Sequence, residues 1–487
     1  MITLGIDLGT SGVKALLLDG ERIVAIASSP LAQSHRKPGW SEQDPEDWWS
    51  ATCVCLDELQ ATQRETLVAV RAIGLSGQMH GATLLDAQAR VLRPCILWDD
   101  GRSAAQCVQL EAHVPQSRHI TGNAAMPGFT APKLLWVREH EPEVFARTAT
   151  VLLPKAWLRF RLCGEFIEEM SDASGTLWLD VGARRWSAEM LAACGLSEAQ
   201  MPRLVEGNAS AGELLPQWVE RWGFVHTPLI AGGAGDNAAG AVGIGAVAPG
   251  DAFLSLGTSG VLWATTAGFA PCPERGVHAF CHALPDTWHQ MGVLLSAASS
   301  LSFWAQATGR SEAQALAPLG ERPTVPAPCW FAPYLSGERT PHNDAHVRGG
   351  FLDLAADTTG AAMTQAVLEG VAYAFRDARD ALAAAGTRTT DADLIGGGSR
   401  SAYWADVLAN VLGMTLHLVE GSEHGCALGA ARLARMAAEG GSVQAAKLKR
   451  LRSFEPRAAL AKQYDEAFDC WRTLYSLLRA VPHAPTT

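Results

Sequence analysis

The chain has 487 residues, of which 48% are hydrophobic and 18% charged, and its formal net charge is −11. This composition is typical of a globular protein with large cores and excludes a disordered chain. The acidic balance argues against a nucleic-acid partner, and no apolar run reaches the roughly 20 residues that cross a bilayer, so we expect a cytoplasmic protein without membrane contact.

Length and an internal repeat together predict two domains. A chain of this length exceeds what one hydrophobic core usually serves. The stretch LGTSGV occurs twice, at Leu8–Val13 and again at Leu256–Val261, and a Pro-Gly turn signal precedes the second copy. We therefore expect an N-terminal domain at residues 1–246 and a C-terminal domain at residues 247–487.

The predicted elements alternate between strands and helices in both halves. Apolar residues alternate over residues 2–8, and two further strand patterns follow, which predicts an antiparallel meander with LGTSGV in its first turn. The later patterns predict strands at 67–78, 228–235, 251–257 and 261–266, helices at 132–146, 237–247 and 360–386, a strand, turn and helix at 391–413, and a helical tail from about residue 445. This mixture predicts two α/β domains.

The repeated turn has a chemical interpretation. Glycine lets backbone N–H groups and hydroxyls come close to a phosphate, so two such turns on facing domains would hold a polyphosphate from both sides. The alternative is that GTSG is simply a favourable hairpin sequence. Two copies, each after an alternating strand, favour a shared ligand.

Asp7 precedes the first turn, whereas Ser255 precedes the second. A carboxylate is repelled by phosphates unless a cation lies between them, so Asp7 indicates Mg²⁺, bound directly or through water. The alternative is a strand-end Asp that binds N–H groups of its own turn. The segment GGGSRS at 396–401 follows a strand and opens a helix, and either borders a nucleotide or is an ordinary turn.

Phosphoryl transfer to an alcohol needs a base for the hydroxyl proton. We predict that Asp236 in AGGAGDNAAG is this base, because small residues before it leave room for a substrate. The alternative is that Asp236 is an N-cap. A position at a helix start should lower its pKa and keep it ionised.

Taken together, these segments resemble the FGGY carbohydrate kinases over nearly the whole chain. The resemblance is carried by IDLGTSGVK, GLSGQMHGATLLD, ILWDDGRS, GFTAPKLLWVREH, GGAGDNAAGAVG, LSLGTSGV, PYLSGERTPH, AVLEGVAYAFRD and IGGGSRSAYW. It implies two actin-like, ribonuclease-H-like domains with ATP in the cleft between them. Within the family, QMHG, WDDGR and SGERTPH look like the segments of kinases that phosphorylate D-xylulose.

The resemblance also implies roles for individual residues. Asp236 would be the catalytic base and Asp7 the metal residue. The ATP phosphates and adenosine would be bound by Thr10, Ser11, Gly12, Lys14, Gly257, Thr258, Gly397 and Gly398. The sugar would be bound by Met79, His80, Asp236 and Asn237, with Trp98, Asp100 and Arg102 as further candidates.

Several of these assignments have alternatives. Met79 and His80 stand where glycerol kinases carry an Arg-Glu pair, which argues against glycerol, but a lone His is often structural. Asp100 and Arg102 either bind sugar hydroxyls or pair with each other, and Trp98 either floors the pocket or packs in the core. Another ketose or polyol, such as L-xylulose or D-ribulose, and a non-catalytic actin-like ATPase are the alternative functions. A homodimer is expected from the resemblance.

Overall fold

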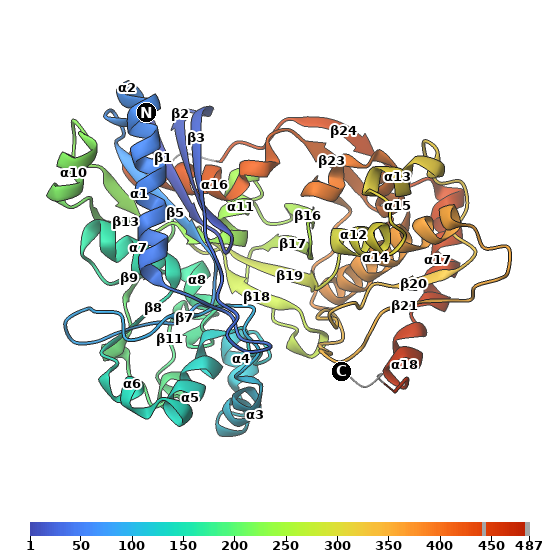
Figure 1. The fold of residues 1–487 in the computed structure, drawn as a ribbon, viewed down its shortest axis with the longest axis horizontal. Helices are drawn as coiled ribbons and strands as arrows, with labels where there is room; N and C mark the ends of the chain where they lie inside the picture. Colours follow the sequence, from blue (N-terminus) through green and yellow to red (C-terminus); the bar gives the residue numbers. More distant parts are fainter. Residues whose placement is uncertain (441–444, 483–487) are drawn as a thin grey trace.

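The computed structural model describes residues 1–440 and 445–482. Two seven-stranded sheets, one in each half of the chain, lie on either side of a layer of helices (Figure 1). Within the described residues, none of the helices combines the length and apolarity that a membrane span requires.

The first sheet begins with the predicted meander. β1 pairs antiparallel with β2, β2 with β3, and β1 is parallel to β5, so the LGTSGV turn joins two neighbouring strands. β14 and β15 both pair parallel with β5, and β13 closes the edge. The strands are β1 (Ile2–Leu8), β2 (Gly12–Asp19), β3 (Arg22–Pro30), β5 (Ala72–Gly77), β13 (Ser210–Glu213), β14 (Leu229–Ala231) and β15 (Ala234–Gly235).

The second sheet repeats the pattern of the first. The order β3-β2-β1-β5-β14-β13 corresponds to β19-β17-β16-β22-β23-β24, and each pair of neighbours has the same relative direction in both sheets. The repeat seen in LGTSGV therefore extends over six strands. The strands are β16 (Ala252–Leu256), β17 (Gly260–Thr266), β18 (His278–Cys281), β19 (Trp288–Leu294), β22 (Asp391–Ile395), β23 (Thr415–Val419) and β24 (Arg450–Phe454).

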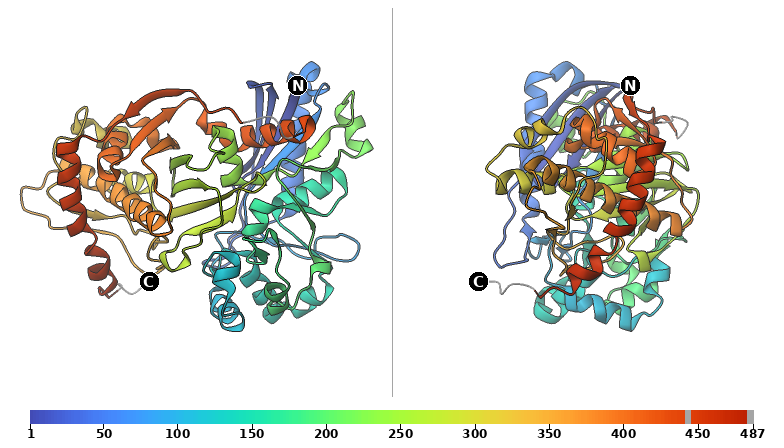
Figure 2. Two further views of the ribbon diagram at one scale, coloured as in Figure 1. Left: turned by 180° about the vertical axis from the view of Figure 1, so that it is seen from behind. Right: turned by 90° about the vertical axis from the view of Figure 1, so that its right-hand side faces the viewer.

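Two helices fill the space between the sheets (Figure 1, Figure 2). α16 (Gly425–Glu439) packs on β1 and β5 of the first sheet, and α11 (Asp236–Ile244) packs on α16. Glycine makes this spacing possible: a Cβ on Gly5 would lie 1.9 Å from the carbonyl oxygen of Ala427, and one on Gly243 would lie 1.9 Å from that of Gly425. Each of the two helices begins at the cleft.

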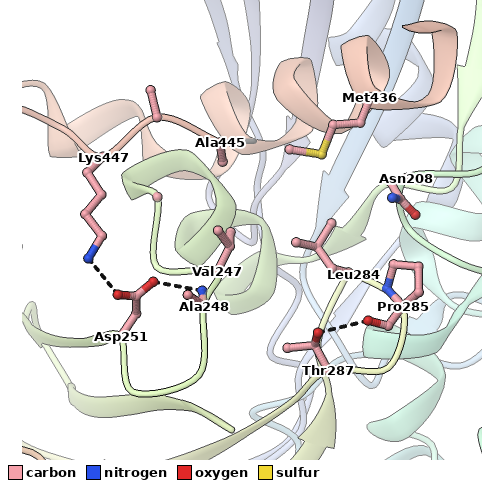
Figure 3. A pocket seen from close by; sticks show the side chains of 12 residues that line it. Asn208, Val247, Ala248, Asp251, Leu284, Pro285, Thr287, Met436, Ala445 and Lys447 are labelled. Carbon is pink, nitrogen blue, oxygen red and sulfur yellow. Dashed lines mark hydrogen bonds and ion pairs between the residues drawn. The ribbon is translucent and has the colours of Figure 1, made fainter. Parts of the chain in front are cut away.

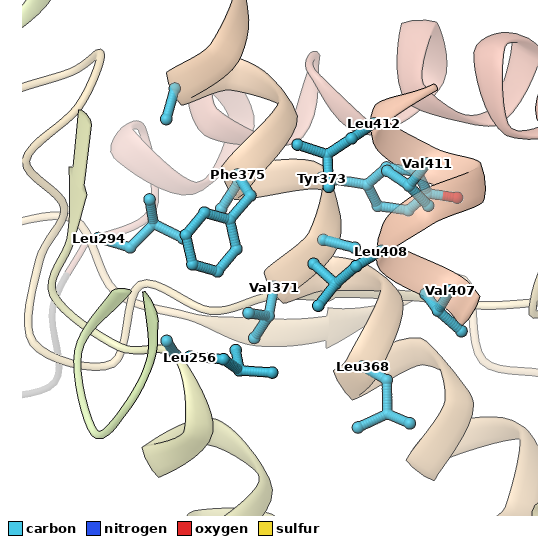
Figure 4. Packing of buried hydrophobic residues seen from close by; sticks show 14 of the residues in the cluster. Leu256, Leu294, Leu368, Val371, Tyr373, Phe375, Val407, Leu408, Val411 and Leu412 are labelled. Atoms are coloured by element: carbon cyan, nitrogen blue, oxygen red, sulfur yellow. The ribbon is translucent and has the colours of Figure 1, made fainter. Parts of the chain in front are cut away.

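Other helices cover the outer faces. In the second half, Leu256, Phe375 and Leu408 meet in a continuous core formed with α14 and α15 (Figure 4). Burying each such side chain contributes roughly 1.5–3 kcal/mol. The covering helices are α1 (Pro45–Thr62) and α7 (Pro154–Cys163) on the first sheet, and α12 (Ala298–Ala307), α14 (Gly360–Ala384), α15 (Ala402–Leu412) and α17 (Ala458–Trp471) around the second.

A lobe of short elements extends from the first sheet between β5 and β14 (Figure 1). Its shorter strands form small two-stranded sheets, and of its helices α8 contacts β15 of the first sheet and β18 of the second. The elements are β6 (Thr83–Leu85), β7 (Cys95–Ile96), β8 (Thr150–Leu152), β9 (Ile167–Glu169), β12 (Arg203–Val205), α3 (Ala104–His113), α4 (Ser117–Thr121), α5 (Thr130–His140), α6 (Pro142–Arg147), α8 (Met170–Ser174) and α9 (Ala188–Ala193).

Where the two halves join, a rear pocket of about 660 Å³ lies at the C-terminal ends of α11 and α16 (Figure 3). Met436, Val247 and Leu284 give it apolar walls. Lys447 Nζ lies 2.6 Å from Asp251 Oδ1 at its margin. The cleft that contains Asp236 is at the opposite ends of the same two helices.

Two sequence-based expectations about secondary structure are wrong. The expected helix at 132–146 is two helices, α5 and α6, because Pro142 begins a new helix and lacks the N–H that would continue the old one. The tail is not helical throughout: β24 precedes α17 and α18 (Leu474–Arg479). Residues 441–444 and 483–487 lie outside the described part.

Candidate active site

The first phosphate turn is held by side chains from other segments. Gly9 N donates to Gly12 O over 2.9 Å, which closes the turn. The Thr10 hydroxyl donates to Gln78 Oε1 at 3.1 Å and accepts from Trp98 Nε1 at 2.9 Å. Because that hydroxyl and the N–H of Gly9 are occupied, the exposed Ser11 and the N–H groups at the tip of the turn are the parts that could meet a ligand.

Asp7 lies at the end of β1, beside this turn. Its Oδ1 accepts a hydrogen bond from Ser76 Oγ at 2.8 Å, so its bond is to a neighbouring strand and not to N–H groups of its own turn. Burial raises the pKa of Asp7, while the Ser76 hydroxyl and the charge of Lys14 oppose that rise. A half-buried carboxylate whose hydrogen-bond partner is a neutral hydroxyl is suited to a cation.

The second LGTSGV turn and the GGGSRS segment line the same space. Gly257 and Thr258 line a pocket of about 550 Å³ together with Gly397 and Gly398. The turn is fixed from behind, because Ala298 N donates to Gly257 O at 2.8 Å. We call this space the glycine-lined pocket. Its size is within the usual range for small-molecule sites.

Asp236 is the first residue of α11 and directly follows β15. It does not cap the helix; Gly235 holds that position, and Asp236 Oδ1 instead accepts from Asn237 N at 2.7 Å and from Asn237 Nδ2 at 2.9 Å. Burial, followed by the negative charge of Asp7, raises the pKa of Asp236 to about 6. The expected lowering by the helix start is therefore wrong. A pKa near the working pH is what a general base requires.

Residues from both halves line a second space, the cleft pocket, of about 300 Å³. It shares Gly257 and Thr258 with the glycine-lined pocket, so the second turn borders both spaces. The first half contributes Met79, His80, Trp98, Asp236 and Asn237, and the second half contributes the β16–β17 turn with His278, Phe280 and Arg339.

His80 has an unusual backbone conformation for a residue with a side chain. Its φ is +70°, in the left-handed region, and its carbonyl oxygen accepts from Lys133 Nζ at 2.9 Å and from Thr130 Oγ1 at 3.1 Å. Its Nδ1 lies 2.7 Å from Gly175 O, which can only accept, so Nδ1 carries the proton. Burial lowers the pKa of His80 to about 3, which leaves a neutral ring whose Nε2 is an acceptor.

Asp100 and Arg102 do not join this site. Arg102 Nη2 lies 2.6 Å from Asp100 Oδ2, Ser41 N donates to the same oxygen at 2.6 Å, and Arg102 also pairs with Glu42 at 2.8 Å. Both side chains are almost fully buried, and neither lines the cleft pocket. The sequence-based assignment to the sugar is thus replaced by its alternative, a mutual ion pair. Trp98, by contrast, lines the pocket and is 41% exposed.

Behind Asp236 lies a buried ionic cluster that the sequence analysis missed. Lys155 Nζ lies 2.9 Å from carboxylate oxygens of Glu168 and Glu169 and 3.4 Å from Asp172 Oδ2, and all four side chains are inaccessible to solvent. Glu169 Oε1 also accepts from Gly235 N at 3.1 Å. The cluster therefore supports the turn that presents Asp236.

The duplicated sheet, the paired glycine turns and the carboxylate between them define an actin-like two-domain phosphotransferase. The chain belongs to the FGGY family of carbohydrate kinases: residues 2–243 match the N-terminal domain of that family and residues 252–438 its C-terminal domain. These matched ranges leave residues 244–251 between them, and the predicted division at 246/247 falls in that gap.

Individual relatives agree with this family. The chain is 54% identical to the xylulose kinase of Escherichia coli K12 over 437 residues, which cover 89% of this chain and 90% of that one. It is 35% identical to the xylulose kinase of Bacillus subtilis over 485 residues, covering 97% and 96%. A crystal structure described as a xyloylose kinase from Brucella ovis superposes with a TM-score of 0.97 at 52% identity, covering 99% and 100%.

Proposed function

We propose that this chain transfers the γ-phosphoryl group of ATP to the C5 hydroxyl of D-xylulose. The observation that carries the proposal is the position of Asp236. It lines the cleft pocket, which is large enough for a sugar and is bordered, like the glycine-lined pocket, by the second LGTSGV turn. Xylulose kinases with 54% and 35% identity over most of the chain support the choice of sugar.

The roles of the groups follow from their surroundings. Asp236 accepts the proton of the C5 hydroxyl as that oxygen bonds to the γ-phosphorus and the bond to ADP breaks. The two turns donate N–H groups to the phosphates. ATP would lie in the glycine-lined pocket, against Gly397 and Gly398.

Mg²⁺ fits the donor set at Asp7. The carboxylate is half-buried, Ser76 satisfies one of its oxygens, and its charge acts on Asp236, so a divalent cation would relieve the repulsion between the two acids. Such an ion neutralises phosphate charge during transfer. The homodimer and the cytoplasmic location expected from the sequence stay predictions.

The test measures ADP release by the purified protein with ATP and Mg²⁺, with no sugar and with D-xylulose, L-xylulose, D-ribulose or xylitol. We expect the largest stimulation with D-xylulose and a phosphate ester at C5 in the product. Equal ADP release without sugar would support the alternative of an actin-like ATPase that phosphorylates no sugar. Preferential stimulation by another sugar of the panel would retain the kinase and replace its substrate.

A further inference from the structure

His278 and Arg339 line the cleft pocket from the second half of the chain, and neither takes part in the proposed proton transfer or phosphate binding. His278 begins β18. Arg339 lies in the SGERTPH segment, and the backbone on both sides of it is fixed: Glu338 Oε1 accepts from Arg339 N at 2.8 Å, and Thr340 N donates to Val293 O at 3.0 Å. Arg339 thus extends from a rigid support.

The guanidinium of Arg339 has no hydrogen bond or ion pair to any residue in the described ranges, although its own backbone N–H is bonded. Its positive charge lowers the pKa of His80 and of His278. Thr340, the next residue, donates to Val293 O, and Val293 lies two positions along β19 from Met291, the register partner of His278. His80 and His278 both pack against Phe129, with ring centroids 4.7 Å and 5.7 Å from it, so Arg339 and the two histidines belong to the same end of the pocket.

The two histidines at this end are both acceptors. His278 Nδ1 lies 2.8 Å from Asn123 Oδ1, and the amide nitrogen of Asn123 donates to Thr121 O and Ala279 O, which fixes Oδ1 as the acceptor. His278 Nδ1 therefore carries the proton and Nε2 does not. The same holds for His80, whose Nδ1 donates to Gly175 O. This end of the pocket offers two neutral acceptors and one group that only donates.

The proposed reaction sets a requirement for this end. A five-carbon 2-ketose closes into a ring through its C5 hydroxyl, so only the open-chain sugar, with a free C2 carbonyl, offers that hydroxyl to ATP. The carbonyl oxygen can only accept a hydrogen bond, and the hydroxyls beside it can donate. Arg339, His80 and His278 complement this arrangement.

Resting on the proposed function, we propose that Arg339 and His278 determine specificity for a 2-ketose: Arg339 donates to the C2 carbonyl, while His278 and His80 accept from the adjacent hydroxyls. In xylitol, C2 is tetrahedral and carries a hydroxyl, which is a weaker acceptor than a carbonyl and adds a proton for which Arg339 offers no acceptor. Such a mismatch at a buried site weakens binding by roughly 10- to 100-fold.

The test measures the binding of D-xylulose and of xylitol by calorimetry without ATP, for the wild type, Arg339→Met, Arg339→Lys and Arg348→Met. Arg348 is exposed further along the chain and bonds only to carbonyl groups nearby, so it is the control. We expect Arg339→Met to reduce the preference for D-xylulose over xylitol by roughly 10- to 100-fold. Arg339→Lys should retain part of it, and Arg348→Met all of it.

Thermal unfolding separates this role from a structural one. Because the guanidinium has no hydrogen bond or ion pair among the described residues, Arg339→Met should leave the melting temperature nearly unchanged or raise it. An unchanged sugar preference in Arg339→Met, or an equal loss in Arg348→Met, would overturn the inference. Failure of the proposed function itself would be distinct, since the wild type would then show no sugar-dependent ADP release.

Discussion

Replacing Lys155 with methionine should destabilise the protein far more than the loss of an exposed ion pair with a similar N–O distance. The substitution keeps most of the side-chain volume but removes the ammonium that lies 2.9 Å from Glu168 and from Glu169. Three carboxylates would then remain in a solvent-free site. The pKa of Asp172 is already raised well above its ordinary value by burial, against the opposing charge of Lys155.

The magnitude follows from burial. Removing one partner of a buried ion pair costs about 3–5 kcal/mol, because it leaves an uncompensated charge in a medium that solvates it poorly. In domains of about 150–250 residues each kcal/mol shifts the melting temperature by about 2–4 °C. Lys155→Met should therefore lower the melting temperature by roughly 6–20 °C.

Lys447→Met is the matched control. Lys447 Nζ lies only 2.6 Å from Asp251 Oδ1, but the lysine side chain is 56% exposed, so its loss should cost less than about 1 kcal/mol. Differential scanning calorimetry at pH 7.5 compares the two variants. Equal shifts for both would refute the argument that burial, and not distance, determines the contribution of an ion pair here.

Three further predictions concern other parts of the chain. Burial lowers the pKa of His282 to about 4 from an ordinary 6.5, so the folded state holds a neutral ring. The free energy of unfolding therefore falls as the pH drops below 6.5, by about 2 kcal/mol at pH 5. His282→Gln should make the melting temperature less dependent on pH between 6.5 and 5, and an unchanged slope would contradict this. Gly243→Ala places a Cβ 1.9 Å from Gly425 O and should lower the free energy of unfolding by at least about 1 kcal/mol. Gly268→Ala adds a Cβ in open space and should lower it less. Calorimetry that shows the reverse order would refute the packing argument. Asp7→Asn should raise the Mg²⁺ concentration needed for half-maximal ADP release and leave sugar binding nearly intact; lost sugar binding with an unchanged Mg²⁺ titration would exclude the role given to Asp7.

Much of the fold follows from local patterns in the sequence. Alternation of apolar residues identifies both hairpins, and the repeated LGTSGV turn indicates a duplication that the structure extends to six strands. β24 was missed because its sequence, RLRSF, carries charges on an exposed edge strand and has no apolar face that a period-two pattern would detect. Its identity as a strand depends on pairing with β23.

The site was predicted in part, and the limits have physical causes. The structure places Asp236 and the second turn in one pocket; both could be named from the sequence because their neighbours are small and their spacing is local, and their roles stay predictions. The direction of the Asp236 pKa shift was wrong because it depends on burial and on Asp7, more than 200 positions away in the chain. Lys155 was missed because a lysine in a helix is usually exposed, and only the fold brings three carboxylates to it.

Sugar-dependent ADP release by Asp236→Asn tests the central claim most directly. The asparagine keeps the shape of the side chain but accepts a proton poorly. We expect the rate with D-xylulose to fall by roughly 100- to 10,000-fold, the usual contribution of a general base, while calorimetry still detects bound sugar. A variant that binds D-xylulose and keeps more than about a tenth of the wild-type rate would contradict the account.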